Sequence, residues 1–137
     1  MRALKGSDSG AALVEFAVVA PMLALLLIGL IDFGRYTFDA MVASNAARAG
    51  ALYGAQNLIT AKDTTGMTNA ALADAQNLPN LTISNASYYC QSPCSSTAPV
   101  YYVTVTASGT FTPIIQYPGL ASSIKVNETS TQRVQNQ

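Results

Sequence analysis

An apolar run of about 21 residues, 11–31, constrains this chain more than any other feature. As an α-helix it would be about 31 Å long, enough to cross a hydrocarbon core of roughly 30 Å. Its strongly apolar side chains favour insertion by a total of roughly 6 kcal/mol, whereas its one charged residue, Glu15, costs at most about 3 kcal/mol. The run is therefore predicted to span a membrane.

The residues on either side of the run predict its orientation. Residues 1–10 are polar and carry Arg2 and Lys5 against Asp8, which by the positive-inside rule places the amino terminus in the cytoplasm. A secretory signal would end in a small-residue cleavage site, and no suitable site follows Ile31 closely. We therefore expect the span to be retained and the rest of the chain to be exported, into the periplasm or beyond the cell.

Two residues within the run, Glu15 and Pro21, each allow two interpretations. Glu15 is a functional candidate because ionisable groups inside a span are expensive, but it lies near one end and could simply reach the lipid headgroups. Pro21 is predicted to kink or locally unwind the helix, unless it is a tolerated membrane proline.

The helix is predicted to continue to about Tyr53, because small and aromatic residues recur every three or four positions. This stripe consists of Phe33, Tyr36, Ala40, Ala43, Ala47, Gly50 and Gly54. It could admit a second helix closely or pack on the chain's own domain, and we expect both over different stretches. Arg35 is predicted to form solvated ion pairs with Asp32 and Asp39, each worth a few tenths of a kcal/mol.

The remaining residues predict one small exported domain with a modest core. Residues 56–67 are expected to form a loop, followed by a helix over 69–77 that Thr68 caps and Pro79 ends. Strands are predicted over 81–89, 100–107 and 123–134, the last polar enough for an edge. The predicted fold class is α+β, with a long N-terminal transmembrane helix, a second short helix and a three-stranded antiparallel sheet packed on the long helix.

Composition argues against several functions. The chain has no histidine, its exported carboxylates form no visible cluster, and it has no glycine-rich phosphate loop, so we predict no enzyme and no cofactor or metal. Its formal net charge is zero and no basic cluster occurs outside residues 1–10, so nucleic acid is not an expected partner.

A polar leader ending in Gly10, followed by Ala11, Glu15 and Phe16, resembles the processing signal of type IV prepilins. The continuation APMLALLLIGLIDFGR at 20–35 and AARAG at 46–50 is similar to the TadE-like family, the minor pseudopilins of tight-adherence (Tad) pilus systems. The resemblance is dense over about the first 55 residues. It is weaker in the tail, where Thr112-Pro113-Ile114-Ile115 and a polar strand near Arg133 resemble the end of family members.

The resemblance implies a pilin-like fold and cleavage between Gly10 and Ala11 by a prepilin peptidase at a bacterial inner membrane. It implies assembly roles for Glu15 and Phe16, in contact with other pilin or pseudopilin subunits and the Tad machinery, in a pilus that serves adhesion. The expected parts are a leader (1–10), a transmembrane part (11–31), its exported continuation (32–55) and a small α+β domain (56–137). The alternative is an uncleaved bitopic membrane protein whose exported domain is a binding module.

Two cysteines, Cys90 and Cys94, lie in the expected turn between the first two strands. In an exported domain a local disulfide is the expected state, and its short loop gives about 2 kcal/mol at most. A zinc site is the alternative, but the sequence has no histidine and no second cysteine pair. Three residues separate the two, which does not fit a thioredoxin-type motif.

Overall fold

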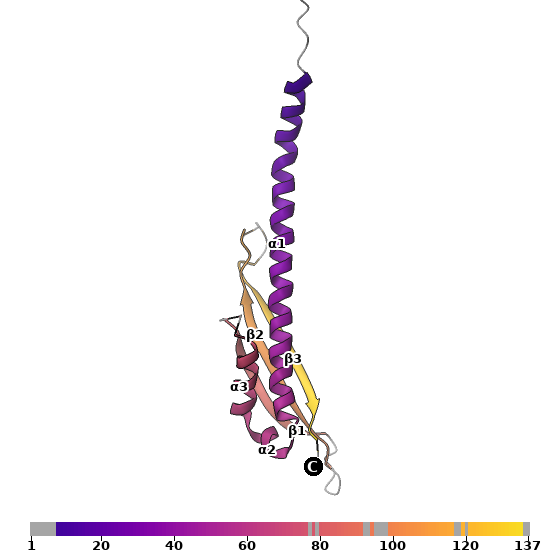
Figure 1. Ribbon diagram of the computed structural model, residues 1–137, viewed down its shortest axis with the longest axis vertical. Helices are drawn as coiled ribbons and strands as arrows, with labels where there is room; N and C mark the ends of the chain where they lie inside the picture. Colours follow the sequence, from indigo (N-terminus) through magenta and orange to yellow (C-terminus); the bar gives the residue numbers. More distant parts are fainter. Residues whose placement is uncertain are drawn as a thin grey trace, which may run out of the picture.

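The computed structural model describes residues 8–76, 78, 80–91, 94, 99–116, 119 and 121–135. One long helix, α1 (Asp8–Gly54), runs through the molecule, and its first half projects from a small domain built around its second half (Figure 1). At 1.5 Å per residue, α1 is about 70 Å long. The predicted α+β class, with a long N-terminal helix and a three-stranded antiparallel sheet, is confirmed.

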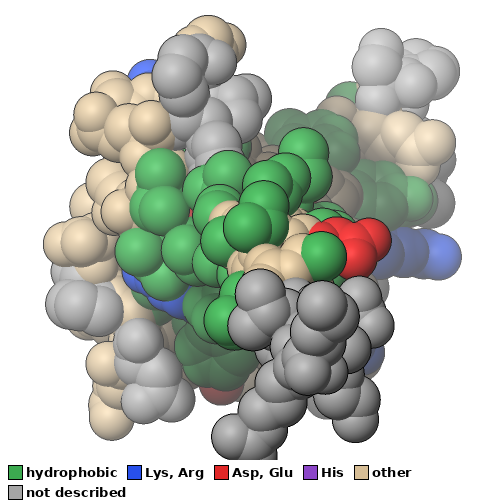
Figure 2. Space-filling model, turned by 90° about the horizontal axis from the view of Figure 1, so that it is seen from above, with side chains coloured by type: hydrophobic (Ala, Val, Ile, Leu, Met, Phe, Trp, Pro, Cys, Tyr) green, Lys and Arg blue, Asp and Glu red, His purple; other side chains and the backbone are tan. Residues whose placement is uncertain are grey.

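The projecting half of α1 is covered with exposed apolar side chains, as expected of a span facing lipid. Figure 2, seen along α1 from its N-terminal end, shows hydrophobic side chains at the centre of the view. Among the helices that the structure describes, only α1 is long and apolar enough to cross a membrane. The helix is continuous through Pro21, so the predicted local unwinding does not occur, and Figure 1 shows no sharp bend. Proline lacks one backbone N–H donor, and the remaining backbone hydrogen bonds of α1 keep the helix continuous.

Two short helices follow, where the sequence predicted a loop and then one helix. Helix α2 (Leu58–Lys62) begins with a capping box in which the Asn57 side chain accepts from Thr60 N–H and the Thr60 hydroxyl accepts from Asn57 N–H. Helix α3 (Thr64–Asp74) is capped by Asp63, so the prediction of a cap at Thr68 was wrong. The Thr68 hydroxyl instead donates to the carbonyl of Thr64 inside the helix.

The sheet has the order β1-β2-β3, with both pairs antiparallel. The strands are β1 (Thr82–Cys90), β2 (Tyr101–Phe111) and β3 (Ile124–Arg133). The predicted spans agree within about one residue, except that β2 runs four residues past the predicted end at Ala107. Serine and glycine near its end weakened the sequence signal, whereas pairing to β3 carries the strand on to Phe111.

One face of the sheet packs against α1 and α3, and the other is polar. Two buried clusters lie between the layers. The first consists of Ala43, Ala46, Ala47, Ala75, Leu81, Ala107, Phe111 and Val126. The second consists of Ala51, Ala55, Ala61, Met67, Ala71, Val103, Val105 and Val134. On the outer face, threonine hydroxyls pair across strands, Thr104 with Thr131 and Thr106 with Thr129, both at 2.9 Å. The sheet therefore has one buried and one hydrated face, typical of an antiparallel sheet covered on one side.

The small-residue stripe of α1 packs on the chain's own domain. Ala43, Ala47, Gly50 and Gly54 are buried, and a Cβ added to Gly50 would lie 2.7 Å from the backbone oxygen of Met67 in α3. Phe33, the first member of the predicted stripe, is instead 66% exposed. Small residues are needed in this half of α1 because they let α3 and β2 approach its backbone.

We expect Gly50→Ala to destabilise the protein by about 1 to 3 kcal/mol, since the added methyl meets backbone that cannot rotate away. Gly34→Ala is the matched control, because nothing lies within 4 Å of a Cβ there, and the better helix propensity of alanine should stabilise by up to about 1 kcal/mol. Chemical denaturation of the full chain in detergent micelles, followed by circular dichroism, measures both. Equal stabilities of the two variants would contradict the close approach.

Candidate functional site

The predicted processing residues lie at the exposed start of α1. Gly10 and Ala11 are helical and exposed, and a Cβ added to Gly10 would meet nothing within 4 Å. The fold itself therefore places no demand for glycine at position 10. A requirement for glycine at this position must therefore come from another molecule that binds it.

Glu15 and Phe16 follow about one turn further along the same exposed helix. Within the described part of the chain, the side chain of Glu15 is exposed and forms no hydrogen bond or ion pair. Because α1 continues as an apolar surface beyond Glu15, this carboxylate is a single anion at one end of a lipid-facing segment. A cation supplied from nearby, or a shift toward the headgroups, would stabilise an anion in that position.

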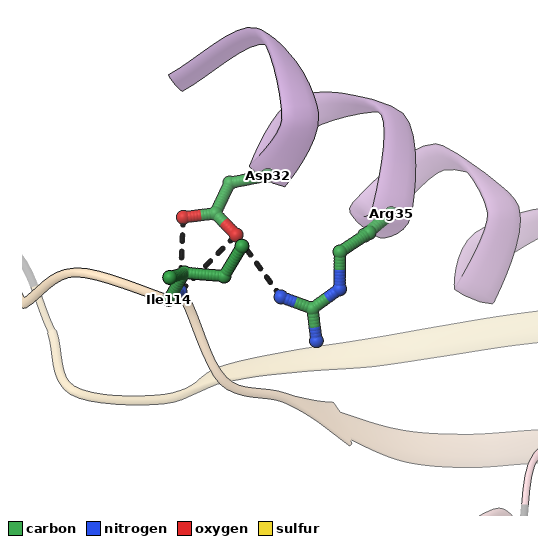
Figure 3. Close-up of polar contacts among 3 residues, drawn as sticks. All are labelled: Asp32, Arg35 and Ile114. Atoms are coloured by element: carbon green, nitrogen blue, oxygen red, sulfur yellow. Dashed lines mark hydrogen bonds and ion pairs between the residues drawn. The ribbon is translucent and has the colours of Figure 1, made fainter. Parts of the chain in front are cut away.

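At the other end of the apolar run, Asp32 holds the domain to the helix (Figure 3). Its carboxylate accepts from the backbone N–H of Ile114 at 3.0 and 3.1 Å and from the Arg35 guanidinium at 3.1 Å. Asp32 is only 8% exposed. The predicted ion pair between Arg35 and Asp32 is therefore present, but Asp32 is buried rather than solvated. No ion pair joins Arg35 to Asp39 among the residues that the structure describes.

Aromatic contacts complete this junction. The Arg35 guanidinium carbon lies 5.4 Å from the centre of the Phe111 ring, a cation–π arrangement. Tyr36 packs edge-on against the same ring, with centroids 5.7 Å apart. Two successive residues of α1 thus fix the end of β2, and Asp32 fixes the segment that follows it.

Sequence reasoning did not connect Asp32 with Ile114, although both belong to the stretches that carry the family resemblance. The available signal was an acidic residue at the end of the apolar run together with the Thr112-Pro113 turn far along the chain. Their 82-residue separation gives no local pattern that would join them.

Comparison with known families identifies this helix. Residues 10–52 match the model of the TadE-like protein family. This TadE-like segment begins at Gly10 and includes Glu15, Asp32 and Arg35, so the predicted resemblance is confirmed over these residues. The family is one of structural pilus components rather than of enzymes, and the match covers α1 without the rest of the domain. Comparisons with curated proteins and with solved structures find no match.

The cysteine pair lies outside the TadE-like segment. Cys90, the last residue of β1, forms a disulfide with Cys94, with Cα atoms 5.6 Å apart. Figure 1 shows that β1 ends at the side of the domain away from the projecting half of α1. The predicted disulfide is present, and no group of three potential metal-ligating side chains occurs among the described residues.

A second polar cluster joins the end of α1 to α3. The Tyr53 hydroxyl donates to Asp63 Oδ2 at 2.9 Å, and Asp63 Oδ1 accepts from Gly66 N–H at 2.8 Å. The backbone bond from Gly66, and then the bond from Tyr53, lower the pKa of Asp63 below its ordinary value. The hydrogen bond to Asp63, with smaller contributions from burial and from the negative charge, raises the pKa of Tyr53.

These directions predict two pH limits on stability. The lowered pKa of Asp63 means that its contribution is present above its unfolded pKa of about 3.9 and is lost as pH falls through the lower folded value. The raised pKa of Tyr53 means that its contribution is present below about pH 10 and is lost as pH rises through the higher folded value.

Asp63→Asn should therefore weaken the acid loss of stability, and Tyr53→Phe should weaken the alkaline loss. Denaturation midpoints of the full chain across pH measure both. Asp74→Asn is the control, because it makes the same charge change at the other end of α3, away from the Tyr53 and Gly66 contacts of Asp63. If Asp63→Asn left the loss of stability at low pH unchanged, that result would contradict the assigned contact.

Proposed function

We propose that this chain is a minor pseudopilin-like subunit that acts in the assembly of a Tad-type pilus for adhesion. The observation that carries the proposal is the TadE-like match at residues 10–52, which spans the predicted cleavage position, the apolar run and most of the buried half of α1. In this proposal residues 1–10 are a leader on the cytoplasmic side, 11–31 cross the inner membrane, and 32–55 and 56–137 are exported together.

The two faces of α1 support a role in assembly. Beyond the apolar run, one face is covered by the chain's own domain, whereas the opposite face exposes Phe38, Met41 and Leu52. These side chains extend the exposed apolar surface of residues 11–31 toward the domain. A neighbouring pilin helix could lie along this face without displacing the domain.

Processing provides the first test. We expect the intact mass of the membrane-extracted protein, from cells with the complete Tad system, to lack residues 1–10. Gly10→Phe should abolish this loss while leaving the fold unchanged, because a side chain at position 10 meets nothing within the chain. The peptidase must then be what rejects the larger residue.

Ala12→Phe is the control, since it adds the same bulk on the other side of the cleavage position. Its intact mass is compared with that of Gly10→Phe in the same cells. Retention of residues 1–10 in the wild-type protein would contradict processing and favour the uncleaved bitopic protein with a binding domain.

A further inference from the structure

We propose that the segment directly after β2, residues 112–116, rests on the membrane surface and inserts Ile114 among the lipid headgroups. The inference needs α1 to span the membrane, but it does not depend on cleavage or on pilus assembly. It assigns a second membrane contact to the domain, in addition to α1 itself.

The first step is the height of Ile114 along α1. Residues 16–31 carry no charge, and Asp32 is the first charged residue after them, so the apolar layer ends near Asp32. The two hydrogen bonds of 3.0 and 3.1 Å from Ile114 N–H to Asp32 hold the backbone of Ile114 at this level (Figure 3). Figure 1 shows the end of β2 at the side of the domain nearest the projecting half of α1.

The second step is the character of the side chains at this level. Ile31 is 55% exposed, Phe33 66% and Ile114 57%, and Ile124, paired with Phe111 at the same end of the sheet, is also exposed. We call these four residues the proximal patch. Single exposed apolar residues are ordinary, but this set lies at the level where the apolar surface of residues 16–31 ends, with Ile31 and Phe33 on opposite faces of α1.

The third step is charge. Two cations border the proximal patch, Arg35 on α1 and Lys125 at the start of β3, both exposed. Asp32 is buried and accepts from Arg35 and from Ile114 N–H, so the charges of Asp32 and Arg35 offset each other and Lys125 supplies the excess positive charge at this level. Apolar side chains with a basic border suit a lipid surface that carries anionic headgroups.

The test uses the absence of tryptophan from the sequence. Ile114→Trp introduces a single tryptophan into the full chain, which is reconstituted in phosphatidylcholine–phosphatidylglycerol vesicles with and without brominated acyl chains. We expect blue-shifted emission that loses most of its intensity with the brominated lipid. Ile59→Trp is the matched control, because Ile59 is 83% exposed on α2, at the far end of the domain, and should emit as a hydrated residue without quenching (Figure 1).

Ile124→Trp is measured in parallel as a second position in the proximal patch. Circular dichroism and an intact Cys90–Cys94 disulfide establish that each variant is folded. Red-shifted, unquenched emission from a folded Ile114→Trp or Ile124→Trp variant would overturn the proposal. Blue-shifted emission that brominated lipid does not quench would also overturn it, because a protein surface would then cover the patch.

Discussion

Glu15→Ala is expected to insert into the membrane normally and yet to abolish pilus assembly. Removing the charge makes the span more apolar, so insertion cannot suffer. Cleavage after Gly10 would leave the amino group of Ala11 as a cation one helical turn from Glu15, where unpaired charge is expensive. Pairing between the amine of one subunit and Glu15 of a neighbour would relieve both charges and would set the axial register of the two helices. The amine could also fold back on Glu15 of its own chain.

The measurement compares wild type and Glu15→Ala at equal membrane levels and with confirmed leader removal. Surface pili are counted, and crosslinking to other pilins is quantified. Leu13→Ala is the control on the same part of α1, because it trims an exposed side chain and keeps the charge. Normal piliation with unchanged crosslinks in Glu15→Ala would reduce Glu15 to a residue that only reaches the headgroups.

Asp32→Ala is expected to destabilise the protein by about 2 to 3 kcal/mol, the cost of losing charge-assisted hydrogen bonds in a site that excludes water. The variant removes the acceptor for Ile114 N–H and the partner of Arg35 together. Because Arg35 also contacts the Phe111 ring, loosening should extend to the end of β2.

Chemical denaturation of the full chain in detergent micelles measures this loss, and hydrogen exchange locates it. We expect faster exchange at Ile114 N–H and near Phe111, with little change in α2. Asp74→Ala, at an exposed position on α3, is the control and should change stability by at most about 0.5 kcal/mol. Unchanged exchange at Ile114 in Asp32→Ala would contradict the contact.

The sequence by itself determined the features that depend on composition and short-range periodicity. A long apolar run with a single charge near one end is typical of a helix that faces lipid or is buried, and alternating β-branched residues favour a strand. The long helix, the three strands and the family resemblance around Gly10 and Glu15 were therefore predictable. The Cys90–Cys94 disulfide was predictable too, because the two cysteines lie in an expected turn of an exported domain.

Only the tertiary structure decided which partners the polar and small residues have. Asp32 has the spacing of a surface ion pair with Arg35, and its burial arises because the chain returns 82 residues later to place Ile114 N–H against it. The starts of α2 and α3 are different, because their caps Asn57 and Asp63 form hydrogen bonds that span only two or three residues; this was a local signal that the sequence reasoning missed. The small-residue stripe predicted that another element approaches α1 closely. Only the three-dimensional packing identified this element as the chain's own α3 and β2, because periodicity predicts which face of a helix is covered but not which residues cover it.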